Sequence, residues 1–265
     1  MGCYSSKTAD SPANRVARWR STGIVALRDR KLKEVPSEIF EVDRFVRTLD
    51  LTNNNIVEIP SEITRLISMQ RLVLAENLIE RLPANLGVFK SLKVLKLDGN
   101  RIKTLPDDLG SLSRLEKLSI AGNSLLSLPK TIGDLHNLLL LNVSNNKLKT
   151  FPESIGSCTS LEELQADGNL VEELPSSICS LINLKSLSLN SNNIKKLPQN
   201  LLKDCKALQN ISLHENPISM DQFQQMEGFQ SFEARRKKKF DKQIDSNVMM
   251  SSSGLDEGLD LKNSR

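Results

Sequence analysis

The sequence predicts an α/β solenoid in which short strands form a curved parallel β-sheet on the concave face and short helical or 3₁₀ segments cover the convex face. Three observations predict this fold. One apolar motif recurs along most of the 265 residues, an asparagine recurs at a constant position within it, and aromatic residues make up only 4% of the chain, so the core must be aliphatic. A single fixed period is typical of solenoids, whose coils each contact only their neighbours.

The repeated unit is 23 residues long. Stretches such as "LKVLKLDGNRIKTLP" (92–106) and "LLLLNVSNNKLKTFP" (138–152) read L-x-x-L-x-L-x-x-N-x-L-x-x-L-P with conservative replacements. The stretch "IVALRDRKLKEVP" (24–36) is a degenerate first copy with Arg30 where an asparagine is due, which makes nine coils. The asparagines recur every 23 residues and once after 24, at Asn54, Asn77, Asn100, Asn123, Asn146, Asn169, Asn192 and Asn216.

Each part of the motif has a physical role. The central L-x-L is predicted to be a strand, with its leucines pointing inward and the intervening residues pointing outward. An asparagine side chain has both donors and acceptors, so a buried column of asparagines is predicted to satisfy the backbone groups of the turn. The Leu-Pro that follows ends the strand because proline has no N–H, and it begins the outer segment.

A solenoid needs both ends covered. At the front, Val16 and Trp19 lie three residues apart and are predicted to form a helical cap over the first coil. We expect residues 1–13 to be a flexible segment, residues 14–242 to form the repeat domain with its caps, and residues 243–265, which are polar and rich in serine and glycine, to be a disordered tail.

The C-terminal cap is predicted to be a helix. Apolar residues recur every three positions and would share one face, with Gly228 as a kink. Ser219 and Gln222 fit a capping box at its start. The residues of this face are Met220, Phe223, Met226, Phe229 and Phe232.

The sequence predicts no enzymatic activity, no metal and no cofactor. It contains no P-loop, no Gly-x-Ser-x-Gly and no His-Glu-x-x-His. Its two histidines, His136 and His214, have no nucleophile or metal cluster beside them in the repeat. Its cysteines lack metal-ligand spacing, and the last three are predicted to pack within the outer segments of a reduced, cytosolic protein: Cys3, Cys158, Cys179 and Cys205.

The outward strand positions form two columns on the concave face, which solenoids use to bind proteins. A generic solvent-exposed surface is the alternative, because the columns are mixed in character and poor in aromatics. One column is Thr48, Arg71, Val94, Lys117, Leu140, Glu163, Ser186 and Asn210, and the next is Asp50, Val73, Lys96, Ser119, Asn142, Gln165, Ser188 and Ser212. The central candidates for partner binding are Arg71, Lys96, Lys117, Leu140, Glu163 and Gln165.

The chain begins "MGCYSSK", which fits the myristoylation pattern Met-Gly-x-x-x-Ser/Thr with Ser6 at the required position. We therefore expect N-myristoylation of Gly2, although a chance Met-Gly start would read the same. One myristoyl chain binds membranes with a constant of only about 10⁴ M⁻¹, so stable anchoring needs a second signal. S-palmitoylation of Cys3 is one candidate.

Basic clusters are another candidate for the second signal. Residues 1–31 hold seven basic and two acidic side chains, and residues 233–242 hold six and two. The second cluster could bind an anionic membrane, act as a nuclear localisation signal, or be the solvated face of the cap. Nucleic-acid binding is not expected, because no aromatic-interleaved strand surface or recognition helix is present. The cluster is Arg235, Arg236, Lys237, Lys238 and Lys239.

Three stretches, "STGIVALRDRKLKEVP" (21–36), "VRTLDLTNNNI" (46–56) and "MEGFQSFEARRKKKF" (226–240), together with the repeat, resemble intracellular leucine-rich repeat proteins. These include the plant Ras-group-related class and, as the closer resemblance, leucine-rich repeat-containing protein fifty-seven and its relatives. The resemblance spans about residues 14–240 and implies a leucine-rich repeat solenoid that acts as an interaction module. By fold analogy, its partner would be a small GTPase or a signalling enzyme.

Two function classes follow from these observations. The first is a monomeric, lipid-anchored, non-catalytic scaffold in signalling, held at the cytosolic face of the plasma membrane or an endomembrane with a cytosolic pool. The second is a soluble adaptor or regulatory subunit, cytosolic or nuclear, of an enzyme complex such as a ligase or phosphatase.

Overall fold

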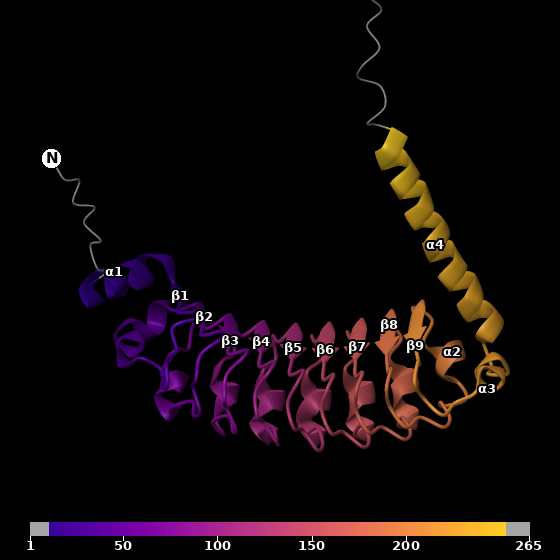
Figure 1. Ribbon diagram of the computed structural model, residues 1–265, viewed down its shortest axis with the longest axis horizontal. Coiled ribbons are helices and arrows are strands. Elements are labelled where there is room, and N and C mark those ends of the chain that lie inside the picture. The colour runs from indigo at the N-terminus through magenta and orange to yellow at the C-terminus, as the bar shows by residue number, and fades with distance from the viewer. Residues whose placement is uncertain (1–10, 253–265) are drawn as a thin grey trace, which may run out of the picture.

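Nine parallel strands form a single curved sheet in the computed structural model, which describes residues 11–252 (Figure 1). The strands follow one another in chain order and pair in register, so the predicted solenoid is confirmed. They are β1 Ile24–Ala26, β2 Thr48–Asp50, β3 Arg71–Val73, β4 Val94–Lys96, β5 Lys117–Ser119, β6 Leu140–Asn142, β7 Glu163–Gln165, β8 Ser186–Ser188 and β9 Asn210–Ser212.

Short helical segments run along the other side of the solenoid (Figure 1). Most of them begin directly after the proline of the motif, whose extended backbone (ψ of 131–150°) ends the preceding stretch and turns the chain into the 3₁₀ segment. They are η1 Ser37–Phe45, η2 Ser61–Arg65, η3 Leu86–Val88, η4 Asp107–Ser111, η5 Lys130–Asp134, η6 Glu153–Ser157, η7 Ser176–Ser180 and the α-helix α2 Leu201–Asp204.

The core lies between the sheet and these outer segments and is aliphatic, as predicted. The middle residue of each interior strand is buried and pairs with its equivalent in the next coil, as Leu72 does with Leu95 and Leu95 with Leu118. Because the coils have nearly equal lengths, equivalent side chains stack along the whole solenoid. One continuous core results, and it runs from Trp19 to Phe232.

The repeated asparagines tie each coil to the coil before it. The Asn77 Nδ2 donates to the carbonyl oxygen of Leu74 in its own coil (3.1 Å) and to that of Leu51 in the preceding coil (2.9 Å). Its Oδ1 accepts from the N–H of Ile56, also in the preceding coil (3.1 Å). The same pattern recurs from Asn54 to Asn216. The first coil has no coil before it, which explains why Arg30 can stand at this position.

The residue before each asparagine position has a left-handed backbone, with φ between 53° and 65°. The sequence analysis did not anticipate this column. A left-handed conformation costs a non-glycine residue about 1–2 kcal/mol. This turn therefore lowers the stability of the fold at the six positions of the column that are not glycine. The column is Asp29, Asn53, Glu76, Gly99, Gly122, Asn145, Gly168, Ser191 and Glu215.

The N-terminal end of the core is covered by α1 (Pro12–Thr22). Ser11 caps the helix by accepting from the N–H of Asn14, and Gly23 ends it with a left-handed φ of 70° and an N–H bond to the carbonyl oxygen of Trp19 (2.8 Å). Trp19 is only 2% exposed and belongs to the core, so it covers the first coil as predicted.

The C-terminal end is covered by α3 (Met220–Gln224) and the start of α4 (Phe229–Ser252). The predicted capping box is present: Ser219 Oγ accepts from the N–H of Gln222, and Gln222 Oε1 accepts from that of Ser219 (both 3.2 Å). The ring of Phe223 packs edge-to-face against those of Phe229 and Phe232, with centroids 5.6 and 6.0 Å apart.

The predicted single helical face was wrong. Gly228 separates two helices instead of kinking one, because its φ of 88° is incompatible with a right-handed helix, and only glycine fits there since a Cβ would lie 2.6 Å from the backbone nitrogen of Lys203. The three-residue spacing therefore does not continue along one helix axis. As a result, Phe232 is buried whereas Met220 is 65% exposed.

Helix α4 also extends beyond the predicted end of the folded part. The sequence placed a disordered tail from residue 243, but the helix continues to Ser252. Its residues 243–252 include no proline or glycine, and the first glycine comes at position 254, so no helix-breaking residue stops it earlier. Residues 1–10 and 253–265 lie outside the described part of the chain.

Replacing Asn123 with alanine is expected to lower the free energy of unfolding by about 3 kcal/mol or more. The substitution leaves the buried N–H of Ile102 without a partner, which costs about 1–3 kcal/mol, and it removes the bonds that Asn123 donates to the carbonyl oxygens of Leu97 and Ile120, each of which contributes about 0.5–1.5 kcal/mol. Urea denaturation measures the change as a lower midpoint. The exposed Asn193, which makes no side-chain hydrogen bond with a described residue, is the control: Asn193→Ala should lower the midpoint by far less. Equal effects of the two changes would contradict the proposed role of the asparagines.

Candidate functional site

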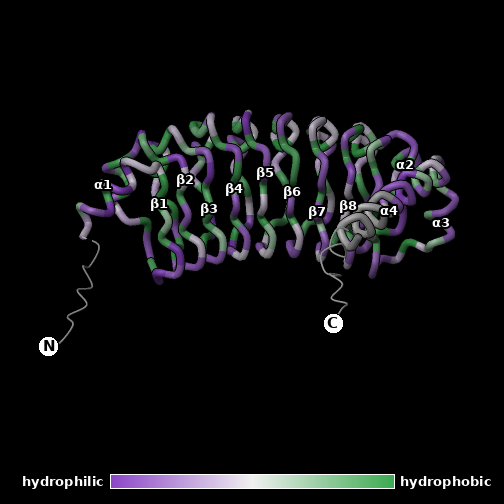
Figure 2. The backbone as a smooth tube through the Cα atoms, turned by 90° about the horizontal axis from the view of Figure 1, so that it is seen from above, coloured by the Kyte–Doolittle hydropathy of each residue, from purple (hydrophilic) through white to green (hydrophobic). Residues whose placement is uncertain are grey.

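The sheet surface consists of two columns of outward-facing residues. The strand register places Thr48, Arg71 and Val94 in one column and Asp50, Val73 and Lys96 in the next, as the sequence predicted. Neighbouring strands lie about 4.8 Å apart, so equivalent residues on successive coils are near neighbours. Seen from above, hydrophilic and hydrophobic residues are interspersed along the coils (Figure 2).

The six predicted partner-binding residues occupy five consecutive strands, β3 to β7. Arg71 and Lys117 are exposed, whereas Lys96, Leu140, Glu163 and Gln165 are half-buried between their neighbours. Two of them contact each other: the amide of Gln165 donates to the carboxylate of Glu163 (2.5 Å). These residues form one continuous surface.

Two acidic side chains that follow β4 and β7, Asp98 and Asp167, hold neighbouring coils together. Asp98 accepts from the hydroxyl of Ser119 (2.5 Å) and from the N–H of Ala121 (2.8 Å), both in the next coil. Asp167 accepts in the same way from Ser188 Oγ (2.7 Å) and from the N–H of Asn190 (2.7 Å). Their carboxylates are therefore occupied by structural bonds.

Asp50, in the second column, is buried and paired with Arg28 of the first coil. Burial alone would raise the pKa of its carboxyl. Hydrogen bonds from the Arg28 guanidinium (Nε at 2.8 Å) and from the hydroxyl and N–H of Thr52 outweigh that effect, so the pKa is lowered from its ordinary value of 3.8. The carboxylate is thus ionised at neutral pH and links β1 to β2.

The C-terminal basic cluster divides into two parts. Arg235 is half-buried and donates to the carbonyl oxygens of Leu208 and Leu202 (both 3.0 Å), and burial lowers the pKa of its guanidinium. It therefore anchors α4 to the last coil. Arg236 is exposed and forms an ion pair with Glu233 (3.2 Å). Lys237 and Lys238 are exposed and Lys239 is half-buried.

The predicted lipidation residues Gly2 and Cys3 lie outside the described residues. Within residues 11–252, no helix is long and apolar enough to span a membrane.

The histidines and cysteines form no catalytic group in residues 11–252, where no cluster of three metal-ligating side chains occurs either. His136 contacts the carbonyl oxygen of Ser157 on the outer side, and His214 is exposed beside β9. Burial raises the pKa of the Cys158 and Cys205 thiols to about 12, so both are protonated at neutral pH and are poor nucleophiles.

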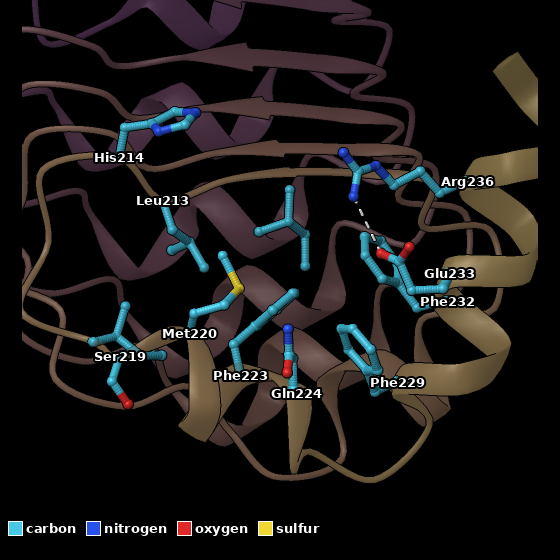
Figure 3. Close-up of a pocket in the computed structure, with 12 residues that line it drawn as sticks. Leu213, His214, Ser219, Met220, Phe223, Gln224, Phe229, Phe232, Glu233 and Arg236 are labelled. Carbon is cyan, nitrogen blue, oxygen red and sulfur yellow. Dashed lines mark hydrogen bonds and ion pairs between the residues drawn. The ribbon is translucent and has the colours of Figure 1, made fainter.

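The structure reveals one feature that the sequence did not, a hollow of about 440 Å³ between β9 and the C-terminal cap (Figure 3). Its lining comes from β9, the segment that follows it, α3 and the first turns of α4. The available sequence signal was the cluster of apolar residues from Met220 to Phe232, but the assumed single helical face assigned all of them to the core. The apolar side chains that line the hollow are Ile211, Leu213, Ile218, Met220, Phe223, Phe229 and Phe232.

Comparisons with known proteins agree with this architecture. Family models described as "Leucine rich repeat" and "Leucine-rich repeat region" match residues 44–102 and 83–169. "Plant intracellular Ras-group-related LRR protein 7" of Oryza sativa subsp. japonica is 84% identical over 261 residues, which cover 98% of this chain and all of that protein. "Plant intracellular Ras-group-related LRR protein 8" of the same organism is 48% identical over 63 residues, 24% of this chain and 17% of that one.

Solved structures share the fold. The chain resembles an internalin from Listeria monocytogenes with a TM-score of 0.69 at 20% identity, over 80% of this chain and 61% of that one. It also resembles the Arabidopsis receptor kinase HAESA, solved in complex with the peptide hormone IDA and the co-receptor SERK1. There the TM-score is 0.63 at 27% identity, over 73% of this chain and 34% of that one.

The Asp50–Arg28 pair predicts a pH dependence of stability. Because the folded pKa of Asp50 lies below its unfolded value, the pair stabilises the fold above about pH 4, and this contribution is lost as the pH falls through the folded pKa. Asp50→Asn should therefore lower the free energy of unfolding at pH 7, and its difference from the wild type should shrink in acid. Denaturation between pH 7 and pH 3 measures this. A difference that stays constant with pH would contradict the role of the charge.

Proposed function

Since the chain belongs to the plant intracellular Ras-group-related leucine-rich repeat proteins, we propose that it is a non-catalytic scaffold whose concave face binds a protein partner. The partner would be a small GTPase or a signalling enzyme. The observation that carries this proposal is the uninterrupted nine-strand surface, on which the five strands β3 to β7 present the six candidate residues side by side. The peptide-bound state of HAESA, which shares the fold, supports it.

We further propose that the scaffold is held at the cytosolic face of a membrane. Gly2 would carry a myristoyl chain, and Cys3, if palmitoylated, would supply the second signal that stable anchoring needs. The lysines of α4 that follow Arg236 would add electrostatic attraction at about 1 kcal/mol per residue. The two basic regions lie at opposite ends of the solenoid, roughly 40 Å apart at about 4.8 Å per strand, so both could contact one surface if the solenoid lies flat (Figure 1).

Introducing a charge at a half-buried apolar position of the concave face tests the interaction. Leu140→Arg places a guanidinium in the middle of the proposed interface. In affinity capture from plant extracts, the amount of a partner recovered with this variant should be lower than with the wild type by roughly tenfold or more. Leu126→Arg is the matched control, because Leu126 is 61% exposed and lies outside the strands. Retention of every partner by Leu140→Arg would refute binding at this face.

Membrane attachment is tested by fractionating plant cells that express Gly2→Ala or Cys3→Ser. We expect Gly2→Ala to move to the soluble fraction, because it removes the acylated amine, and Cys3→Ser to retain partial membrane association, because one chain binds only marginally. Unchanged membrane association of both variants would contradict the lipid anchor. A wild-type protein found only in the soluble fraction would favour the soluble adaptor instead.

A further inference from the structure

We propose that the N-terminal half of the concave face recognises an acidic segment of the partner, oriented so that a basic residue of that segment reaches β7. This inference rests on the proposed function, because it names the chemistry of a partner that binds this face. It is carried by an unneutralised cationic cluster of three residues, Arg71, Lys96 and Lys117, which we call the concave cation triad.

The triad occupies three consecutive strands. Arg71 begins β3, Lys96 ends β4 and Lys117 begins β5, so Arg71 and Lys117 share a column about 10 Å apart, with Lys96 in the next column between them. Their backbones bond within the sheet, but none of the three side chains forms a hydrogen bond or ion pair with another residue of the described range 11–252. Like charges this close raise the local potential and attract an anionic group.

The acidic residues that could neutralise the triad have other partners. Asp50 is paired with Arg28, and Asp98 accepts bonds from Ser119 and Ala121. Glu116, just before β5, is paired with Lys93 (2.8 Å). Within the described residues, no carboxylate bonds to a side chain of the triad, and Asp98, whose bonds come from neutral donors, is the one unpaired acid among these three, so the three cations leave an excess of positive charge for a ligand.

Charge changes sign along the same column. Beyond Lys117 comes the apolar Leu140 on β6 and then Glu163 on β7, whose carboxylate accepts from Gln165 and is not paired with a cation in the described structure. The column from Arg71 to Glu163 covers four strand spacings, about 19 Å, which an extended peptide spans in about six residues. A segment with acidic residues, then an apolar residue, then a basic residue fits in one direction. The reverse direction would place like charges opposite each other.

A library of random 16-residue peptides displayed on phage tests this with the full-length, unacylated protein. The wild type should enrich peptides that carry acidic residues at one end and a basic residue about six positions away, in one consistent order. Against a synthetic peptide so selected, the triple variant R71E/K96E/K117E should lose roughly tenfold or more in affinity at low salt. The difference should diminish in 1 M salt, where the Debye length falls to about 3 Å. Glu163→Lys should abolish the preference for the basic residue.

The control is K103E/K149E/K195E, which reverses three exposed lysines that lie outside the strands and also have no side-chain partner among residues 11–252. This variant should retain the wild-type affinity. Selected peptides with no excess of acidic residues, or equal losses in the two triple variants, would overturn the proposed chemistry. If Leu140→Arg nevertheless abolished binding, the concave face would stand as the interaction surface. Binding untouched by Leu140→Arg would overturn the face itself.

Discussion

The asparagine side chain that follows each strand is the interaction on which the rest of the structure depends. Every coil must turn sharply after its strand, and the turn buries backbone groups that water cannot reach. One amide satisfies groups of its own coil and of the coil before it, as Asn123 does with Ile120, Leu97 and Ile102. The asparagine bonds therefore both close the turn and set the spacing between neighbouring coils. A leucine at this position could fill the space but would leave the buried N–H of Ile102 unpaired and remove a bond from each of the two carbonyl oxygens.

Constant spacing explains why the molecule has a usable surface. Because successive coils repeat at one interval, outward residues line up in columns instead of scattering, and Arg71, Val94, Lys117, Leu140 and Glu163 become neighbours although 92 residues separate the first from the last. The acids at structurally demanding places, Asp50 and Asp98, are bound within the solenoid. The remaining charges define what the face can attract.

The two exposed ends of the apolar core are covered in different ways. At the front, a single capped helix lays Trp19 on the first coil and stops at Gly23. At the back, the helix is interrupted at Gly228, whose positive φ and close approach to the backbone of Lys203 admit only glycine. Arg235 then attaches α4 to the carbonyl oxygens of Leu202 and Leu208. Helix α4 consequently leaves the body of the solenoid from the strand side, and a hollow remains beside β9 (Figure 1, Figure 3).

The sequence by itself determined the features that repeat: the number of coils, the strand register, the inward leucines, the asparagine positions and the column to which Arg71 and Lys117 belong. Each depends on local periodicity, which can be read directly from the amino-acid sequence. Only the tertiary structure decided which charges are already paired, because Asp98 and Arg235 bond to residues 21 to 33 positions away. It also decided the break at Gly228 and the left-handed column. These depend on close contacts and turns that occur once or lack a strict residue signature, so no periodic pattern encodes them.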